Sequence, residues 1–142
     1  MAEYRTTFTV GAPPDEVIAY VADLENLPHW DSSVRQASLT VDPGPSGGRA
    51  FDVVVGFYGR QLAATYQIVA VDPNRYVEWT IEGKASGTTR IDVAAQGPGS
   101  TIDYRVELSM NGIARMLDRG LTVALEGIGE NAERGLRRTF GR

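Results

Sequence analysis

The stretch FTVGAPPDEVIAYVADLENLPHW, residues 8–30, contains the change of pattern around which the rest of the chain is organised. Residues 4–10 are rich in aromatic and β-branched side chains and predict a strand. Residues 11–14 break that strand, and their two prolines, followed by two acids, suit the first turn of a short helix. Residues 26–31 then predict a second short helix or a turn.

Beyond this stretch, residues 35–110 have the pattern of strands and turns, and antiparallel partners must agree on which face is buried. Four successive strand pairings keep one apolar face, which predicts a meander of antiparallel strands. The turn at residues 97–100 is expected to place Gln96 opposite Thr101. The predicted inward pairs are Val93 with Tyr104, Ile91 with Val106, Thr89 with Leu108, Trp79 with Ile91, Val77 with Val93, Ile68 with Trp79, Tyr66 with Ile81, Leu62 with Val55 and Arg60 with Phe57, and the predicted outward pairs are Asp92 with Arg105 and Arg90 with Glu107.

A long helix is predicted from about residue 112 to residue 140, because apolar residues recur there at spacings of three and four. The helix would cover the apolar face of the sheet. It also contains four glycines, each of which costs about 1 kcal/mol relative to alanine. These glycines indicate either a close approach of another backbone or a bend or frayed end. The apolar stripe consists of Ile113, Leu117, Leu121, Ala124, Ile128, Ala132 and Leu136, and the glycines are Gly120, Gly127, Gly129 and Gly135.

The composition excludes several classes of function. The chain has 142 residues, a net charge of -4, no cysteine and one histidine. A disulfide framework, thiolate chemistry and a cysteine zinc site are excluded, and we expect neither a metal nor a cofactor. Charges of both signs are mixed, so nucleic acid is a poor partner. No apolar run is long enough to span a membrane, and the charged N-terminus does not have the pattern of a signal peptide, so we expect a cytoplasmic protein.

Residues 8–30 resemble the opening of the polyketide cyclase/dehydrase and lipid-transport superfamily, also called START-like, SRPBCC or birch-pollen-allergen-like. The resemblance rests on Ala12-Pro13 at the strand end, on Leu27-Pro28-His29-Trp30, and on residues 71–73 leading to residues 76–79. It covers essentially the whole chain, residues 1–142, as one domain. It implies an α+β helix-grip fold, in which a curved antiparallel sheet of about seven strands wraps around a long C-terminal helix, with two short helices after the first strand. Family members share a deep apolar cavity between sheet and helix.

The inward face supplies the candidate ligand-binding residues, which would hold an apolar molecule mainly by the area that they bury. For any one of them, filling the core is the competing interpretation. The ligand-binding candidates are Trp30, Phe51, Val53, Val55, Phe57, Leu62, Tyr66, Trp79, Ile91, Tyr104, Val106, Leu117, Leu121 and Ala124. The candidate catalytic residues are His29, which can exchange a proton near neutral pH, Tyr66 and Tyr104, which can donate to a carbonyl, and Arg60, which can meet a carboxylate at the cavity mouth. His29 is expected to be a surface residue at the rim rather than a catalytic base.

The leading hypothesis is a non-catalytic carrier of a small hydrophobic ligand, such as a lipid, a polyketide-like molecule or an isoprenoid. The short helices and residues 41–48 would gate the cavity. The alternative is a cyclase or dehydratase that acts on a ketone-bearing substrate. A third possibility is a fold that only binds another protein.

Overall fold

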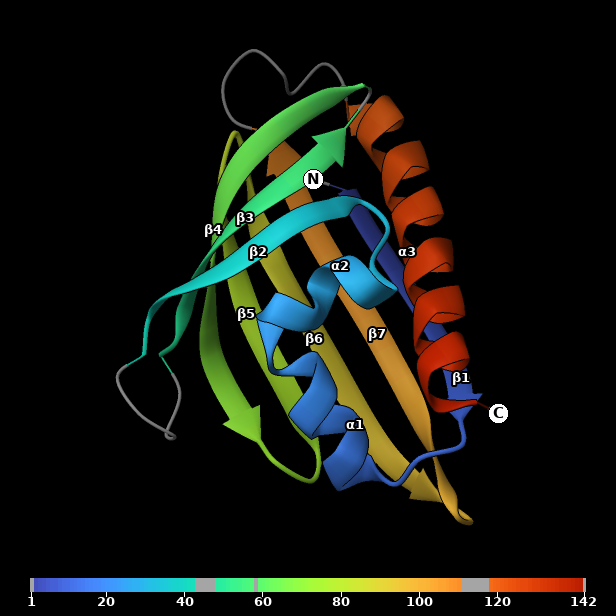
Figure 1. The fold of residues 1–142 in the computed structure, drawn as a ribbon. Helices are drawn as coiled ribbons and strands as arrows, with labels where there is room; N and C mark the ends of the chain where they lie inside the picture. The colour runs from blue at the N-terminus through green and yellow to red at the C-terminus, as the bar shows by residue number, and fades with distance from the viewer. Residues whose placement is uncertain (1, 43–47, 58, 111–117, 142) are drawn as a thin grey trace.

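The computed structural model describes residues 2–42, 48–57, 59–110 and 118–141. The chain forms one antiparallel sheet, a long C-terminal helix and three short helical segments after the first strand (Figure 1). The elements in chain order are β1 (Ala2–Val10), α1 (Pro14–Val21), the 3₁₀ helix η1 (Leu24–Asn26), α2 (Leu27–Trp30), β2 (Val34–Val41), β3 (Ala50–Phe57), β4 (Arg60–Asp72), β5 (Tyr76–Gly83), β6 (Ala85–Gln96), β7 (Gly99–Met110) and α3 (Asp118–Phe140). The predicted helix-grip architecture is therefore confirmed, with seven strands and the six-strand meander from β2 to β7.

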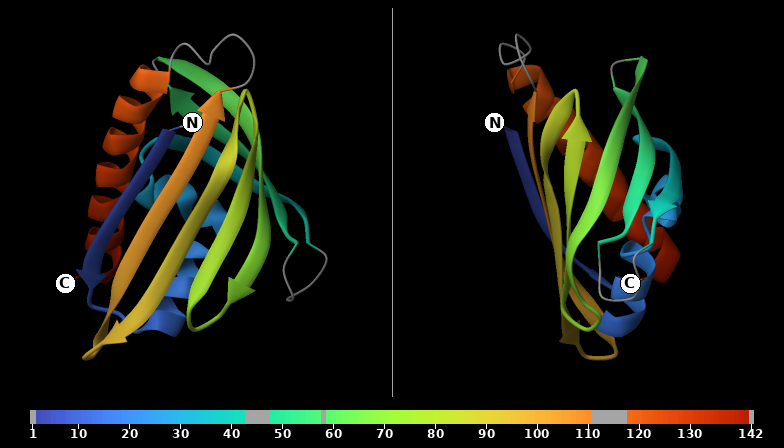
Figure 2. Two further views of the ribbon diagram at one scale, coloured as in Figure 1. Left: turned by 180° about the vertical axis from the view of Figure 1, so that it is seen from behind. Right: turned by 90° about the vertical axis from the view of Figure 1, so that its left-hand side faces the viewer.

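The sheet has the strand order β1-β7-β6-β5-β4-β3-β2, so that β1 and β2 form its two edges. Figure 2 shows that the sheet is strongly curved and that α3 and the short helices lie on the same side of it. The long helix packs mainly along β1 and also contacts β7 and α2. None of the helices in the described residues combines the length and apolar character needed to cross a bilayer.

The predicted register is correct in two hairpins and wrong in two. Leu62 faces Val55 and Ile68 faces Trp79, as expected. Between β6 and β7, however, Ile91 faces Tyr104 and Gln96 faces Gly99, which is a shift of two residues. The turn contains only Gly97 and Pro98, and Gly97 has a φ of 57°, which a hairpin turn beginning with glycine requires. A shift of two keeps every side chain on its predicted face.

The β5–β6 hairpin is shifted in the same way, because Trp79 faces Thr89 and Val77 faces Ile91. The paired residues are placed symmetrically about Lys84, where the chain bends between the two strands. Gly87 permits the close packing that follows, since a Cβ there would lie 1.8 Å from the carbonyl oxygen of Glu107 on β7. Ile91, Val93 and Thr89 therefore each face a residue two positions away from the partner predicted for them.

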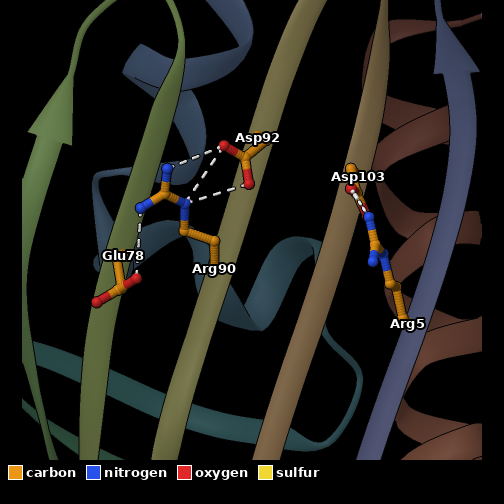
Figure 3. A network of polar contacts seen from close by, with 5 residues as sticks. All are labelled: Arg5, Glu78, Arg90, Asp92 and Asp103. Carbon is orange, nitrogen blue, oxygen red and sulfur yellow. Dashed lines mark hydrogen bonds and ion pairs between the residues drawn. The ribbon is translucent and has the colours of Figure 1, made fainter.

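The outward charge pairs predicted across β6 and β7 are also wrong, since Asp92 lies opposite Asp103 and Arg90 lies opposite Arg105. Opposite charges meet instead along β6, directly across β5 and β6, and along a diagonal between β1 and β7 (Figure 3). Arg90 Nε donates to Asp92 at 3.1 Å, and its Nη1 lies 3.4 Å from Glu78. Arg5 on β1 pairs with Asp103 through two hydrogen bonds of 3.0 and 2.6 Å. These contacts lie on the face away from the core.

The described part of α3 packs through the predicted apolar stripe. Ala132 and Leu136 are fully buried, and Ile128 is partly buried. One predicted close approach of a backbone is real, because a Cβ on Gly135 would lie 2.1 Å from the carbonyl oxygen of Trp30. Gly129 packs against a side chain instead, since a Cβ there would lie 2.0 Å from the ring of Tyr4. Gly127, in contrast, faces open space. Gly120, Leu121 and Ala124 lie in the part of α3 whose side chains are not described. Ile113 and Leu117 lie within residues 111–117, which are outside the described residues.

Candidate functional site

An open apolar pocket lies between the sheet and α3. Among the described side chains, its walls come from the five strands β3 to β7, from the bend at Lys84 and from α3. The space open to the centre of a water-sized sphere is about 60 Å³, and all the space between the wall atoms, including open solvent, is about 530 Å³. The smaller volume exceeds the roughly 10–15 Å³ that one water needs but falls short of the roughly 300–1,000 Å³ of ordinary ligand pockets. A larger occupant must therefore extend into the mouth or displace wall side chains. The lining residues are Val55, Leu62, Ala63, Ala64, Tyr66, Ile81, Lys84, Ala85, Leu108 and Ile128.

The sequence-predicted ligand-binding residues divide into three groups. Val55, Leu62 and Tyr66 line the pocket. Seven others are buried in the core without forming its wall. The side chains of the remaining four lie outside the described part of the structure. The buried group consists of Trp30, Phe51, Val53, Trp79, Ile91, Tyr104 and Val106, and the last group consists of Phe57, Leu117, Leu121 and Ala124.

Asp31 introduces a buried carboxylate beside this core, directly after α2. It is 7% exposed. Its Oδ1 accepts hydrogen bonds from the backbone N–H of Ser33 at 3.0 Å and from the Ser33 hydroxyl at 2.6 Å. Burial raises the pKa of Asp31, and the two hydrogen bonds from Ser33 offset only part of that effect. The short turn thus holds an acid in an environment that disfavours its charge.

Two buried tyrosines lie within the electrostatic reach of Asp31. Burial is the main cause that raises the pKa of Tyr66, and the charge of Asp31 raises it further. The same two causes, in the same order, raise the pKa of Tyr104. Both hydroxyls therefore stay protonated at neutral pH and can donate hydrogen bonds. Tyr66 is the one that lines the pocket.

The two tryptophans bring further donors into the interior. Trp30 contacts the ring of Tyr104 edge to face, with centroids 6.4 Å apart. The indole nitrogens of Trp30 and Trp79 are both buried and have no hydrogen-bond partner among the described residues. Buried donors without partners are unusual, and a ligand or water oxygen can satisfy them. The core beside the pocket is therefore apolar in bulk but carries two indole N–H donors without partners among the described residues.

The four candidate catalytic residues are not brought together. His29 is exposed on α2, and its carbonyl oxygen accepts from Arg138 of α3 at 3.2 Å. Arg60 is exposed at the start of β4. Tyr104 is buried in the core, and only Tyr66 reaches the pocket wall. Within the described ranges, no three histidine or acidic side chains are arranged to share a metal ion.

Sequence reasoning missed Lys84 and underestimated Asp31. Lys84 belongs to a bend, where the alternation of inward and outward side chains stops, so no face could be assigned to it. Asp31 was not among the predicted site residues, whereas the structure buries it where its charge raises the pKa of Tyr66. The sequence WDSS did carry a usable signal, because an aspartate followed two residues later by serine is typical of a turn that the side chain closes.

Comparison with known proteins agrees with this architecture. A crystal structure of TTHA0849 from Thermus thermophilus is similar with a TM-score of 0.83 and 16% identity, covering 96% of this chain and 94% of that one. The Zhui aromatase/cyclase from Streptomyces sp. R1128 (TM-score 0.73, 13% identity, 98% and 96% covered) and a START superfamily protein from Mycobacterium smegmatis (0.73, 14%, 98% and 99%) share the fold. No curated protein matches the sequence. Residues 1–141 match the family described as polyketide cyclase / dehydrase and lipid transport, and the chain belongs to that family.

Proposed function

We propose that this chain binds and carries a small hydrophobic molecule in the pocket between the sheet and α3. The observation that carries the proposal is the chemistry of the wall, since eight of its ten described residues are apolar. Each 100 Å² of apolar ligand surface removed from water contributes about 2.5 kcal/mol to binding before the cost of association. A wall of this kind gives affinity by area, while Tyr66 supplies a donor that orients the ligand.

The carrier function is favoured over catalysis by the scatter of the reactive groups. His29 and Arg60 are exposed on separate elements, so neither stands opposite Tyr66 as an acid-base partner. The raised pKa of Tyr66 suits a hydrogen-bond donor and disfavours a proton donor that must ionise. A ligand held by these walls is bound without a paired acid and base around it.

The second candidate is an enzyme that acts on a ketone-bearing substrate, in the manner of a cyclase or dehydratase. Tyr66 favours it, because a protonated hydroxyl on an apolar wall can polarise a ketone oxygen. The Tyr66→Phe variant separates the two functions. Both functions predict that the variant still binds its ligand. Only the enzyme predicts turnover of a ketone-bearing substrate that is lost with the hydroxyl.

The first experiment is native mass spectrometry of the protein as purified from cells, followed by denaturing extraction. A hydrophobic molecule bound at one per chain is the expected result. The matched variants are Ala64→Phe, which fills the pocket, and Gln67→Phe, which adds the same ring to the exposed face of β4. The affinity for the neutral dye N-phenyl-naphthylamine should fall at least tenfold in Ala64→Phe and stay unchanged in Gln67→Phe. Equal affinities in these two folded variants would refute the pocket as the binding site.

A further inference from the structure

The described wall of the pocket carries one charge, the ammonium group of Lys84. This residue forms the bend between β5 and β6, and its side chain is exposed while still contributing to the wall. It is the single lysine of the chain, whose other thirteen basic residues are arginines. A lysine suits such a position, because its apolar stem can line a hydrophobic wall while the ammonium stays in water.

Three arginines of the sheet and of α3 have acidic partners, whereas Lys84 has none among the described residues. Arg5 pairs with Asp103, Arg90 with Asp92 and Glu78, and Arg137 with Glu133. In the described ranges, no carboxylate forms an ion pair with Lys84. The acid nearest in sequence, Glu82, lines a polar hollow on the opposite face of the sheet together with Asp52. The ammonium is therefore available to a charge that arrives with a ligand.

The position of Lys84 also fixes which end of a ligand it would meet. Ile81 lies three residues before Lys84 and directly opposite Tyr66. At about 3.3 Å per strand residue, the mouth and the inner tyrosine are separated by roughly 10 Å of apolar wall. The inner end is the wrong place for an anion, because the charge of Asp31 already raises the pKa of Tyr66. An anionic group is favoured at the mouth and disfavoured inside.

We propose, on the basis of the carrier function above, that the pocket takes an amphipathic carboxylate, with its anionic head against Lys84 and its aliphatic body between β4, β5 and α3. The head stays hydrated at the mouth, so the cost of removing a charge from water is small. The body passes Leu62, Ile81 and Ile128 and ends near the hydroxyl of Tyr66.

The test compares dodecanoic acid, dodecanol and dodecylamine, which share one apolar body, by displacement of the same neutral dye at pH 8. Wild-type protein should bind the acid about fivefold more tightly than the alcohol, which corresponds to about 1 kcal/mol for an exposed ion pair. The amine should bind more weakly than the alcohol. Salt at roughly 0.5 M should reduce the preference for the acid, since the charges at the mouth are screened.

The variants are Lys84→Met, which keeps the apolar stem, and Lys84→Glu, which reverses the charge. The first should bring the ratio of acid to alcohol close to one, and the second should favour the amine. Arg105→Gln removes one positive charge from the outer face and controls for net charge. Because both side chains are exposed, melting curves should confirm that all variants fold.

The outcomes separate the inference from the function on which it rests. Equal binding of acid and alcohol by the wild type would overturn the role of Lys84 and leave the carrier function intact. Failure of all three probes to displace the dye would overturn both. A preference that survives in Lys84→Met and disappears in Arg60→Gln would assign the head to Arg60 at the neighbouring turn, against the proposal.

Discussion

Two glycines on α3 provide a matched pair that measures how tightly the helix is seated. Gly135 packs against the backbone of Trp30, where an added Cβ would lie 2.1 Å from the carbonyl oxygen and 2.6 Å from Cα. Gly127 lies two turns earlier on the same helix and has open space around it. The same substitution, glycine to alanine, therefore tests helix propensity alone at Gly127 and propensity plus contact at Gly135.

The magnitudes follow from these distances. Alanine at position 127 should stabilise the helix by about 1 kcal/mol. At position 135 the same gain is opposed by overpacking, which costs about 1–3 kcal/mol and more where the contacted atoms are backbone. Because α2 and α3 would have to separate by about 1 Å, we expect a net loss of about 1–2 kcal/mol. The two variants should thus differ by about 2–3 kcal/mol.

The assay is thermal and urea unfolding followed by circular dichroism. In a domain of this size, 1 kcal/mol corresponds to roughly 3 °C in Tm. We expect Gly127→Ala to melt about 3 °C above the wild type and Gly135→Ala to melt about 3–6 °C below it. If Gly135→Ala proved as stable as Gly127→Ala, α3 would not rest on the backbone of Trp30, and the packing of the helix described above would be wrong.

Three further predictions concern charge. Asp31→Asn should raise Tm at pH 7, because burial raises the pKa of Asp31 in the folded protein above its unfolded value near 3.8. The contribution of the acid to stability is present below that unfolded value and is lost as the pH rises through the folded pKa. The gain should vanish in melts near pH 3, and an equal gain at both pH values would contradict the argument. A hydrogen bond to Glu3 raises the pKa of Glu107, so the wild type should lose stability relative to Glu3→Gln between pH 4.5 and pH 7, as scanning calorimetry can test. Arg90→Met should cost about 1 kcal/mol at low salt and less in 1 M salt, because the variant leaves Asp92 without its partner; a salt-independent loss would point to packing instead.

The fold was accessible from the sequence because its decisive signals are local and periodic. A strand side chain points inward or outward with a period of two, so Trp79, Ile91 and Val106 could be assigned to the core without knowing their partners. The helical stripe was equally visible, and Ala132 and Leu136 occupy its buried side. The resemblance to a known family then supplied the order in which sheet and helix combine.

The register was less accessible, because alternation fixes only its parity. A turn of four residues at Gly97–Ser100 and a turn of two at Gly97-Pro98 leave the same side chains inward and differ by two positions in the pairing. Choosing between them requires the conformation of Gly97, whose positive φ closes the shorter turn. The error therefore left the core intact and misplaced the charge pairs, since charges depend on which individual residues meet.

The site was the least accessible part, for a related physical reason. A pocket wall consists of strand side chains that obey the alternation, and Val55, Leu62 and Tyr66 could be found in that way. The polar groups that give a pocket its chemistry lie instead where the alternation stops.

Lys84 is at a bend and Asp31 is in a turn closed by its own carboxylate. At such places the backbone reverses direction, and a polar side chain can reach the edge of an apolar space without interrupting a strand. A periodic pattern predicts the walls and passes over these positions. The carrier proposal is therefore best tested by changing Lys84, which lines the pocket, and Asp31, whose buried charge raises the pKa of Tyr66 in the pocket wall, rather than the apolar residues.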